Sequence, residues 1–159
     1  MYQRILVPID TSTTSHVVLE EVKRMVNGLH AKVCLVTVID TSQFATSPDE
    51  LFHELQLKED QRLRDERREI IWRFLEDCVS DLRVPGIEVE TKLVEKFGGK
   101  ISNAILDEAT HWGADLLIMG THGREGLSHA LMGSVAEGVI RHAQIPVLLV
   151  NVASDDEYG

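Results

Sequence analysis

The sequence predicts an α/β protein built on a doubly wound parallel sheet. Short, almost wholly apolar runs recur along the chain, which is typical of strands covered on both faces. Between them lie segments whose apolar residues follow the spacing of an amphipathic helix. Strands that alternate with helices indicate parallel pairing, with helices on the faces of the sheet. The 159 residues suit one such domain, expected over residues 1–152.

Two strands are expected early in the chain, and an acid follows each apolar run. The first covers 5–10 and ends in Asp10, and the second covers 32–39 and is followed by Asp40. A helix is expected over about 13–30, because apolar residues recur there at helical spacing. The Thr-Ser-Thr sequence at its start supplies candidate N-caps.

A longer helical region is expected over 48–83, as one helix or two in series. Ser47, followed by proline, is its candidate N-cap. Residues 58–69 carry five basic and five acidic side chains, and an apolar stripe covers 70–82. We interpret the charged run as a solvated face with ion pairs four residues apart. A partner surface is the alternative.

The rest of the chain continues the alternation of strands and helices. A glycine pair at 98–99 predicts a turn, and Gly113 is a candidate C-cap. The expected elements are a strand over 87–94, a helix over 101–112, a strand over 114–119, a glycine-rich loop over 120–133, a helix over 134–142 and a strand over 145–152. Residues 153–159 are expected to be an acidic tail.

Composition and charge exclude several classes of function. The net charge of −10 argues against nucleic-acid and anionic-membrane partners, since both need clustered cations. The start of the sequence shows no signal-peptide pattern, and no apolar run approaches the length of a membrane helix. Cys34 and Cys78 stand among apolar residues and are expected to be buried thiols in a reducing cytoplasm.

The glycine-rich loop after the fourth strand has the character of a phosphate site. Gly120 and Gly123 allow a sharp turn, and nine residues later Gly133 and Ser134 open a helix. The start of a helix offers unpaired N–H groups and a partial positive charge to an anion. The loop is neither a Walker A motif nor a dinucleotide fingerprint. A glycine-rich loop that serves only close packing is the alternative.

The sequence resembles the universal stress protein family over about residues 2–152. The spacing Gly-x2-Gly-x9-Gly-Ser matches the motif of the family's ATP-binding branch. The sequence around that motif, the opening Arg-Ile-Leu-Val-Pro-Ile-Asp and the closing Pro-Val-Leu-Leu-Val are also similar to the family. One departure is visible: Gly99-Lys100-Ile101 stands where the family often has Gly-x-Pro, which leaves the shape of that turn open.

The resemblance implies a bound ATP, with a divalent ion such as Mg²⁺ bridging its phosphates. Asp10 and the Val38 backbone would hold the adenine, Pro8 and Met119 would shape that end of the pocket, and Gly120 would lie near the ribose. Gly123, Gly133, Ser134 and Val135 would hold the phosphates, and Arg124 would pair with one of them.

The resemblance also implies the strand order 3-2-1-4-5 and a homodimer. The apolar strand 145–152 would then form an edge, and a second copy would cover it. The expected function is a nucleotide-dependent regulatory protein of the stress response, located in the cytoplasm. Two alternatives stay open: a slow ATP hydrolase, and an interaction module with a vestigial pocket. Efficient hydrolysis is not expected, because no residue is an evident general base.

Other residues have simpler interpretations. The spacings of His122, His129 and His142 fit no standard zinc site, and His122 is expected to support the loop through a hydrogen bond. Asp10 and Asp40 lack a positioned nucleophile for catalysis, and a receiver domain would have two adjacent acids after its first strand. Trp72 and Trp112 lie on apolar helical faces and are expected in the core.

Overall fold

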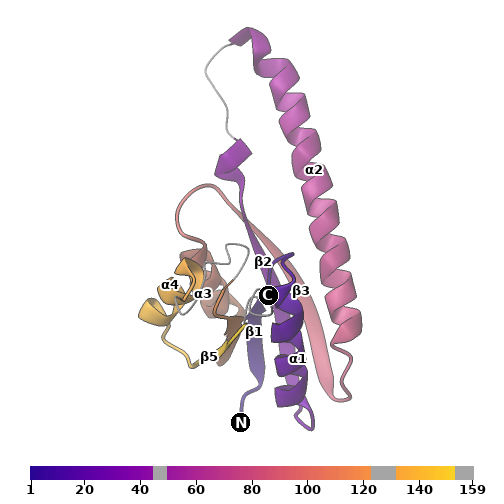
Figure 1. Cartoon of the computed structure of the whole chain (residues 1–159), viewed down its shortest axis with the longest axis vertical. Helices are drawn as coiled ribbons and strands as arrows, with labels where there is room; N and C mark the ends of the chain where they lie inside the picture. The colour runs from indigo at the N-terminus through magenta and orange to yellow at the C-terminus, as the bar shows by residue number, and fades with distance from the viewer. Residues whose placement is uncertain (45–49, 123–131, 153–159) are drawn as a thin grey trace, which may run out of the picture.

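The computed structural model describes residues 1–44, 50–122 and 132–152, with the side chains of 43–56 left aside. Its five strands form one parallel sheet in the order β3-β2-β1-β4-β5, as expected (Figure 1). The strands are β1 (Arg4–Pro8), β2 (Ala31–Asp40), β3 (Ile87–Lys96), β4 (Leu116–Gly120) and β5 (Val147–Val150). The helices are α1 (Thr14–Val26), the 3-10 turn η1 (Thr41–Phe44), α2 (Glu50–Asp81), α3 (Ile101–Trp112) and α4 (Ser134–His142).

The helices divide between the two faces of the sheet, and each face has its own core. Side chains alternate along β1: Ile5 and Val7 pack with α1 and α2, whereas Leu6 packs with α3 and α4. The same alternation places Val33 and Leu35 in the first cluster and Cys34 in the second. Because both faces of the central strands are covered, these strands are apolar at almost every position.

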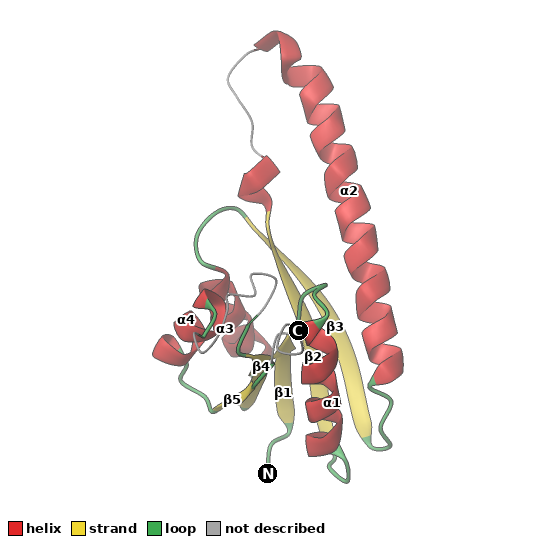
Figure 2. Ribbon diagram, viewed as in Figure 1, coloured by secondary structure: helices red, strands yellow, loops and turns green. Residues whose placement is uncertain are grey.

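Helix α2 is one continuous helix of 32 residues, and only its second half is packed in the core. The side chains that the structure describes on α2 begin at residue 57, and their apolar core contacts begin at Ile71 and continue through Leu75, Cys78 and the following Leu82. The first half projects past the carboxyl ends of the strands (Figure 2). The helix thus carries one apolar half and one charged half.

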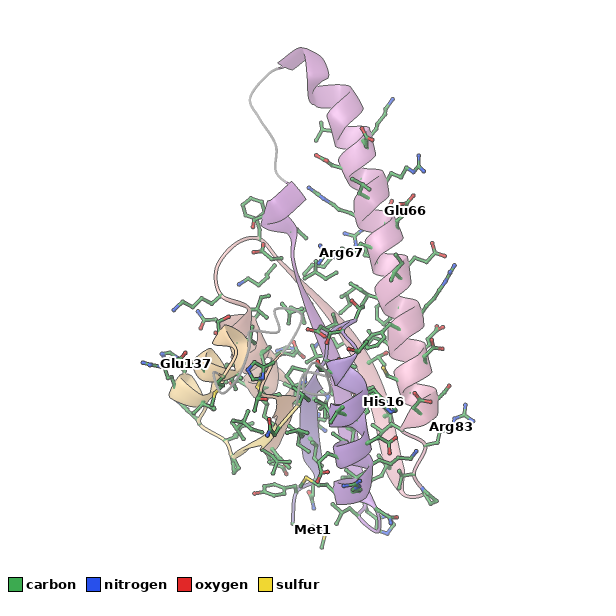
Figure 3. The ribbon with its side chains drawn as sticks, viewed as in Figure 1. Met1, His16, Glu66, Arg67, Arg83 and Glu137 are labelled. Carbon is green, nitrogen blue, oxygen red and sulfur yellow. The ribbon has the colours of Figure 1, made fainter. Side chains whose placement is uncertain are left out.

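Ion pairs lie along the exposed surface of α2, in its charged half and just beyond it, as the solvated-face interpretation expects. Arg62 pairs with Glu66, and Arg73 pairs with Glu69, each four residues apart. Arg68 reaches across to Glu95 at the end of β3, and this contact raises the pKa of Arg68 and lowers the pKa of Glu95. Arg67 lies on the side of the helix that faces the sheet (Figure 3).

Two expectations about the core are wrong at single positions. Trp72, expected in the core, and Ile70, in the expected apolar stripe, are exposed at 41% and 61% of their surface. Both flank Ile71, which faces the core, and one residue turns an α-helix by about 100°. Trp112 is half-buried against the α3–α4 cluster, and its indole N–H donates to Glu90 at 3.0 Å.

Element ends differ from expectation by a few residues. Helix α1 stops at Val26, four residues early, and β5 covers only four residues of the expected eight. Thr13 is the N-cap of α1 but makes no side-chain cap bond, and Ser47 lies outside the described residues. Gly113 ends α3 as expected, with φ 75° and its N–H directed to the Ala109 and Thr110 carbonyls.

Two further expectations concern the cysteines and the membrane-spanning segments. Cys34 and Cys78 are buried free thiols, and burial raises the pKa of each to about 11, so both are protonated at neutral pH. Among the described residues, no helix is long and apolar enough to cross a bilayer.

The division of α2 into two halves predicts unequal effects of leucine truncation. Leu75 is fully buried, so Leu75→Ala should lower the free energy of unfolding by about 2–5 kcal/mol. Leu63 on the same helix is 47% exposed, so Leu63→Ala should change it by less than about 0.5 kcal/mol. Urea unfolding of both variants measures the difference. Equal losses would show that the projecting half is packed as tightly as the docked half.

Candidate functional site

The carboxyl edge of the sheet, between β1 and β4, is the candidate site. Helices α1 and α2 leave the sheet on one face and α3 and α4 on the other, so the connections part at this point. In open α/β sheets, such a switch point leaves a crevice for a ligand beyond the strand ends. The chain topology alone therefore indicates this edge as the candidate site.

Strand register brings the residues predicted for the base and ribose to this edge. Pro8 is level with Val36 on β2, so Val38 stands two residues beyond it, near Asp10. On the other side, β1 pairs with β4 from Ile5↔Leu116, and continuing this register places Met119 beside Pro8. Gly120 follows Met119 and pairs with Val150 on β5.

The side chains of Val38 and Met119 belong to the α3–α4 face. Met119 is only 5% exposed in the core of that face, and Val38 packs against the same cluster. Pro8 follows Leu6 by two residues and shares its face by alternation. Met119 is therefore a buried support for the site, whereas Pro8 and Val38 are half-exposed at its border.

Asp10 is held in place by its own neighbours. Its Oδ1 accepts the Ser12 N–H at 2.9 Å, which forms a local turn after β1. Ser15, which is buried in the first turn of α1, donates its hydroxyl to the Asp10 carbonyl at 2.6 Å and accepts the Asp10 N–H at 3.2 Å. The half-buried carboxylate is thus fixed in direction at the strand end.

The start of α4 presents the backbone groups predicted for phosphate binding. Gly133 is its N-cap and has no side chain to cap the helix. The N–H groups of Ser134 and Val135 belong to the first turn, which has no intrahelical partners for them. The Gly133 N–H differs, because it donates to the Thr121 carbonyl at 2.8 Å. Ser134 and Val135 are therefore the available donors.

Thr121 organises the loop, although the sequence reasoning assigned it no role. Its N–H donates to Val150 on β5 at 3.0 Å, and its carbonyl accepts the Gly133 N–H. Its hydroxyl lies 3.1 Å from Nδ1 of His122, which agrees with the expected support by that histidine. Thr121 thus joins the end of β4 to the start of α4. The sequence feature that could have identified Thr121 is its position inside the glycine motif.

Some predicted residues fall outside this description. Gly123, Arg124 and His129 lie outside the described residues. His142 contacts the Gly138 carbonyl at the far end of α4. Within the described ranges, no group of three or more His, Cys, Asp or Glu side chains could hold a metal ion.

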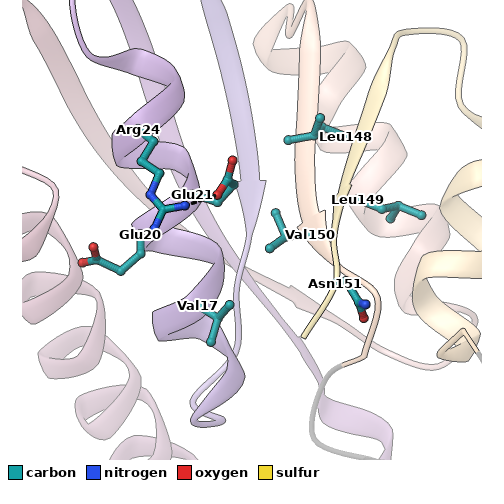
Figure 4. Close-up of a pocket in the computed structure, with 8 residues that line it drawn as sticks. All are labelled: Val17, Glu20, Glu21, Arg24, Leu148, Leu149, Val150 and Asn151. Carbon is teal, nitrogen blue, oxygen red and sulfur yellow. Dashed lines mark hydrogen bonds and ion pairs between the residues drawn. The ribbon is translucent and has the colours of Figure 1, made fainter. Parts of the chain in front are cut away.

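A pocket of about 350 Å³ lies elsewhere, between α1 and β5 (Figure 4). Val17, Glu20 and Arg24 line it from α1, and Leu148 and Val150 line it from β5. None of the residues predicted to bind nucleotide lines it, so this pocket is distinct from the carboxyl-edge site. It lies beside β5, the outer strand on this side of the described sheet.

Comparison with known proteins decides the family. The family model described as the universal stress protein family matches residues 1–151. The chain belongs to the universal stress protein family. Universal stress protein MJ0531 of Methanocaldococcus jannaschii is 35% identical over 153 residues, covering 94% of this chain and 82% of its own. Universal stress protein MJ0577 of the same organism is 32% identical over 168 residues, covering 94% and 95%.

Solved structures of universal stress proteins share the fold. The structure of MJ0577 has a TM-score of 0.74 at 28% identity and covers 97% of this chain and 99% of that one. The Archaeoglobus fulgidus universal stress protein, solved in complex with dAMP, has a TM-score of 0.58 at 25% identity, covering 93% and 97%. The strand order expected from the resemblance is therefore that of the family.

Packing between α3 and α4 predicts the effect of a larger residue at Gly138. A Cβ at Gly138 would lie 2.8 Å from the Cβ of Ser102 and closer still to its hydroxyl, so rotating the serine would not remove the overlap. Ala in a helix is favoured over Gly by about 1 kcal/mol, but overpacking costs about 1–3 kcal/mol. Gly138→Ala should therefore lower the thermal midpoint.

A double-mutant cycle tests this packing. Adding Ser102→Gly removes both crowded atoms, so the coupling between the two substitutions should be favourable. Additive effects in thermal unfolding would contradict a direct contact between these positions.

Proposed function

We propose that this universal stress protein binds ATP at the carboxyl edge and acts as a nucleotide-dependent regulator in the cytoplasm. The observation that carries the proposal is the uncapped start of α4, held beside the switch point by Thr121. A helix start in this place offers directed N–H donors to a phosphate chain. The related Archaeoglobus fulgidus protein was solved with the nucleotide dAMP, which supports a nucleotide as the ligand class.

The residues that the structure describes carry groups suited to the adenine and the phosphates of ATP. Asp10 carries a fixed carboxylate that can accept a hydrogen bond from the amino group of adenine. Val38 offers its backbone N–H and carbonyl groups near the end of β2. The Ser134 hydroxyl and the N–H groups of Ser134 and Val135 would meet the phosphates. A divalent ion, once bound between phosphates, would supply further positive charge. Gly123 and Arg124 would complete the loop.

Regulation is favoured over catalysis by the state of the acids at this edge. Asp10 is engaged by the Ser12 N–H and Ser15, and Asp40 by the N–H groups of Ser42 and Gly98. Slow hydrolysis is the alternative, and a phosphate-release assay distinguishes it. The two buried free thiols support the cytoplasm as the compartment, since reducing conditions preserve them.

Nucleotide binding predicts a thermal shift. At about 100 times the dissociation constant, Mg-ATP should stabilise the fold by roughly 2.7 kcal/mol, which is about 5–10 °C for a domain of this size. The shift should shrink when the divalent ion is chelated. Gly123→Val should abolish it with the fold intact, because its side chain would fill the phosphate path. Absence of a shift at millimolar Mg-ATP would reject ATP, and AMP and dAMP in parallel would then test a monophosphate.

The exposed edge of β5 supports a homodimer. Strand β5 is the outer strand on its side, and Val147, Leu148 and Leu149 are only half-buried in the single chain. Pro146 and Val150 direct their carbonyls to β4, so Leu149 directs its N–H away from the sheet. Pairing with a second copy would satisfy these groups and cover the adjoining pocket.

The dimer predicts a mass of about twice 17.8 kDa in light scattering. Leu149→Pro removes the outward N–H while sparing the groups that bond to β4, so it should yield a folded monomer. Circular dichroism checks that the fold is kept. A monomer mass for the unaltered protein would exclude this dimer.

A further inference from the structure

Asp40, at the carboxyl end of β2, holds two loops with a single oxygen. Its Oδ1 accepts the Ser42 N–H at 2.9 Å and the Gly98 N–H at 3.0 Å. Ser42 lies in η1, which follows β2, whereas Gly98 lies in the turn between β3 and α3. One carboxylate therefore joins the segment after β2 to a turn whose Gly98 lies 58 residues beyond Asp40 in sequence.

Neighbouring contacts reinforce the same junction. Thr41 donates its hydroxyl to the Lys96 carbonyl at 3.0 Å. Lys96 extends its ammonium over the following turn, where a Cβ on Gly99 would approach it to 3.1 Å. Hydrogen bonds from Ser42 and Gly98, together with the positive charge of Lys96, lower the pKa of Asp40 and keep it ionised at neutral pH.

The turn that Asp40 holds has an unusual backbone. Gly98 and Gly99 both adopt left-handed conformations, with φ of 70° and 77°. Side chains disfavour that region, so consecutive glycines permit the turn without fixing it. Helix α3 starts two residues after Gly99 and has no side-chain cap, since Lys100 is its N-cap residue. The Asp40 contact thus supplies an anchor that the local sequence lacks.

This junction borders the base end of the proposed nucleotide site. Val38, the proposed backbone partner of the base, lies two residues before Asp40 on β2 and pairs with Val94 on β3. Ile101, in the first turn of α3, packs against the same cluster as Val38 and Val94. The position of the β3–α3 turn therefore sets the wall beside Val38.

We propose that Asp40 is a positioning residue for base recognition: it fixes the β3–α3 turn against the end of β2 and so shapes the wall that the adenine meets. The inference rests on the proposed nucleotide function. Asp40 does not touch the nucleotide in this role; it acts through Ser42 and Gly98. It gives the turn an anchor that the Gly-Lys-Ile sequence at 99–101 does not itself supply.

Asp40→Ala and Asp40→Asn separate this role from a general loss of stability. Alanine removes the acceptor, and the affinity for Mg-ATP in calorimetry should fall about tenfold. Asparagine keeps one oxygen that can accept both N–H groups, so it should restore most of the affinity. The affinity for Mg-tripolyphosphate, which has no base, should be unchanged in all three proteins, and the preference for ATP over GTP should shrink only in Asp40→Ala.

Asp115 provides a matched control. Its carboxylate likewise accepts two backbone N–H groups, those of Gln3 and Arg4 at 2.9 Å each, but at the opposite edge of the sheet. Asp115→Ala should lower the thermal midpoint and leave the ATP affinity unchanged. A loss of affinity equal to that of Asp40→Ala would overturn the inference, as would unchanged ATP affinity in Asp40→Ala.

Hydrogen exchange in the ligand-free protein gives an independent readout. The Gly98 and Ser42 amides should be protected in the unaltered protein and in Asp40→Asn, and should exchange faster in Asp40→Ala. Unchanged exchange would overturn the inference without reference to any nucleotide. Failure of the unaltered protein to bind Mg-ATP, with the exchange result as expected, would reject the proposed function and leave the anchoring of the turn in place.

Discussion

The site depends on one constraint of the fold: the helices that follow β1 and β4 lie on opposite faces of the sheet. Since α1 and α2 cover one face and α3 and α4 the other, the helices that the structure describes diverge at the carboxyl edge between these strands. The turn after β1 and the loop after β4 can therefore both address one ligand. Thr121 stabilises this arrangement, because its backbone hydrogen bonds connect the end of β4 to the start of α4 and to β5.

The acidic composition and a polyanionic ligand are compatible because they act over different distances. The net charge of −10 is spread over the chain, and salt screens distant charges over roughly 8 Å. A helix start acts within hydrogen-bond range, where directed N–H groups dominate. Part of the charge is also matched locally, as the ion pairs along α2 and the Glu137–Arg141 pair on α4 show.

Hydrogen bonds to backbone groups hold the described parts of the connections at the site. Asp10 holds the turn after β1, Thr121 holds the loop after β4, and Asp40 joins the loops after β2 and β3. Each contact satisfies backbone groups that a strand end leaves open, and each limits how the adjoining loop can move.

The sequence by itself determined the alternation of strands and helices, the glycine motif and the acids at two strand ends, because periodicity and spacing are local properties of the chain. Local pattern also misleads where several consecutive residues are apolar, because it does not show which of them faces the core. Trp72 was expected in the core and Ile70 in the apolar stripe, yet both side chains face solvent. Only the tertiary structure decided that α2 is packed along half its length, that the Gly133 N–H is taken by Thr121, and that Asp40 reaches Gly98. These depend on register and on contacts between residues far apart in sequence, for which no local pattern carries a signal.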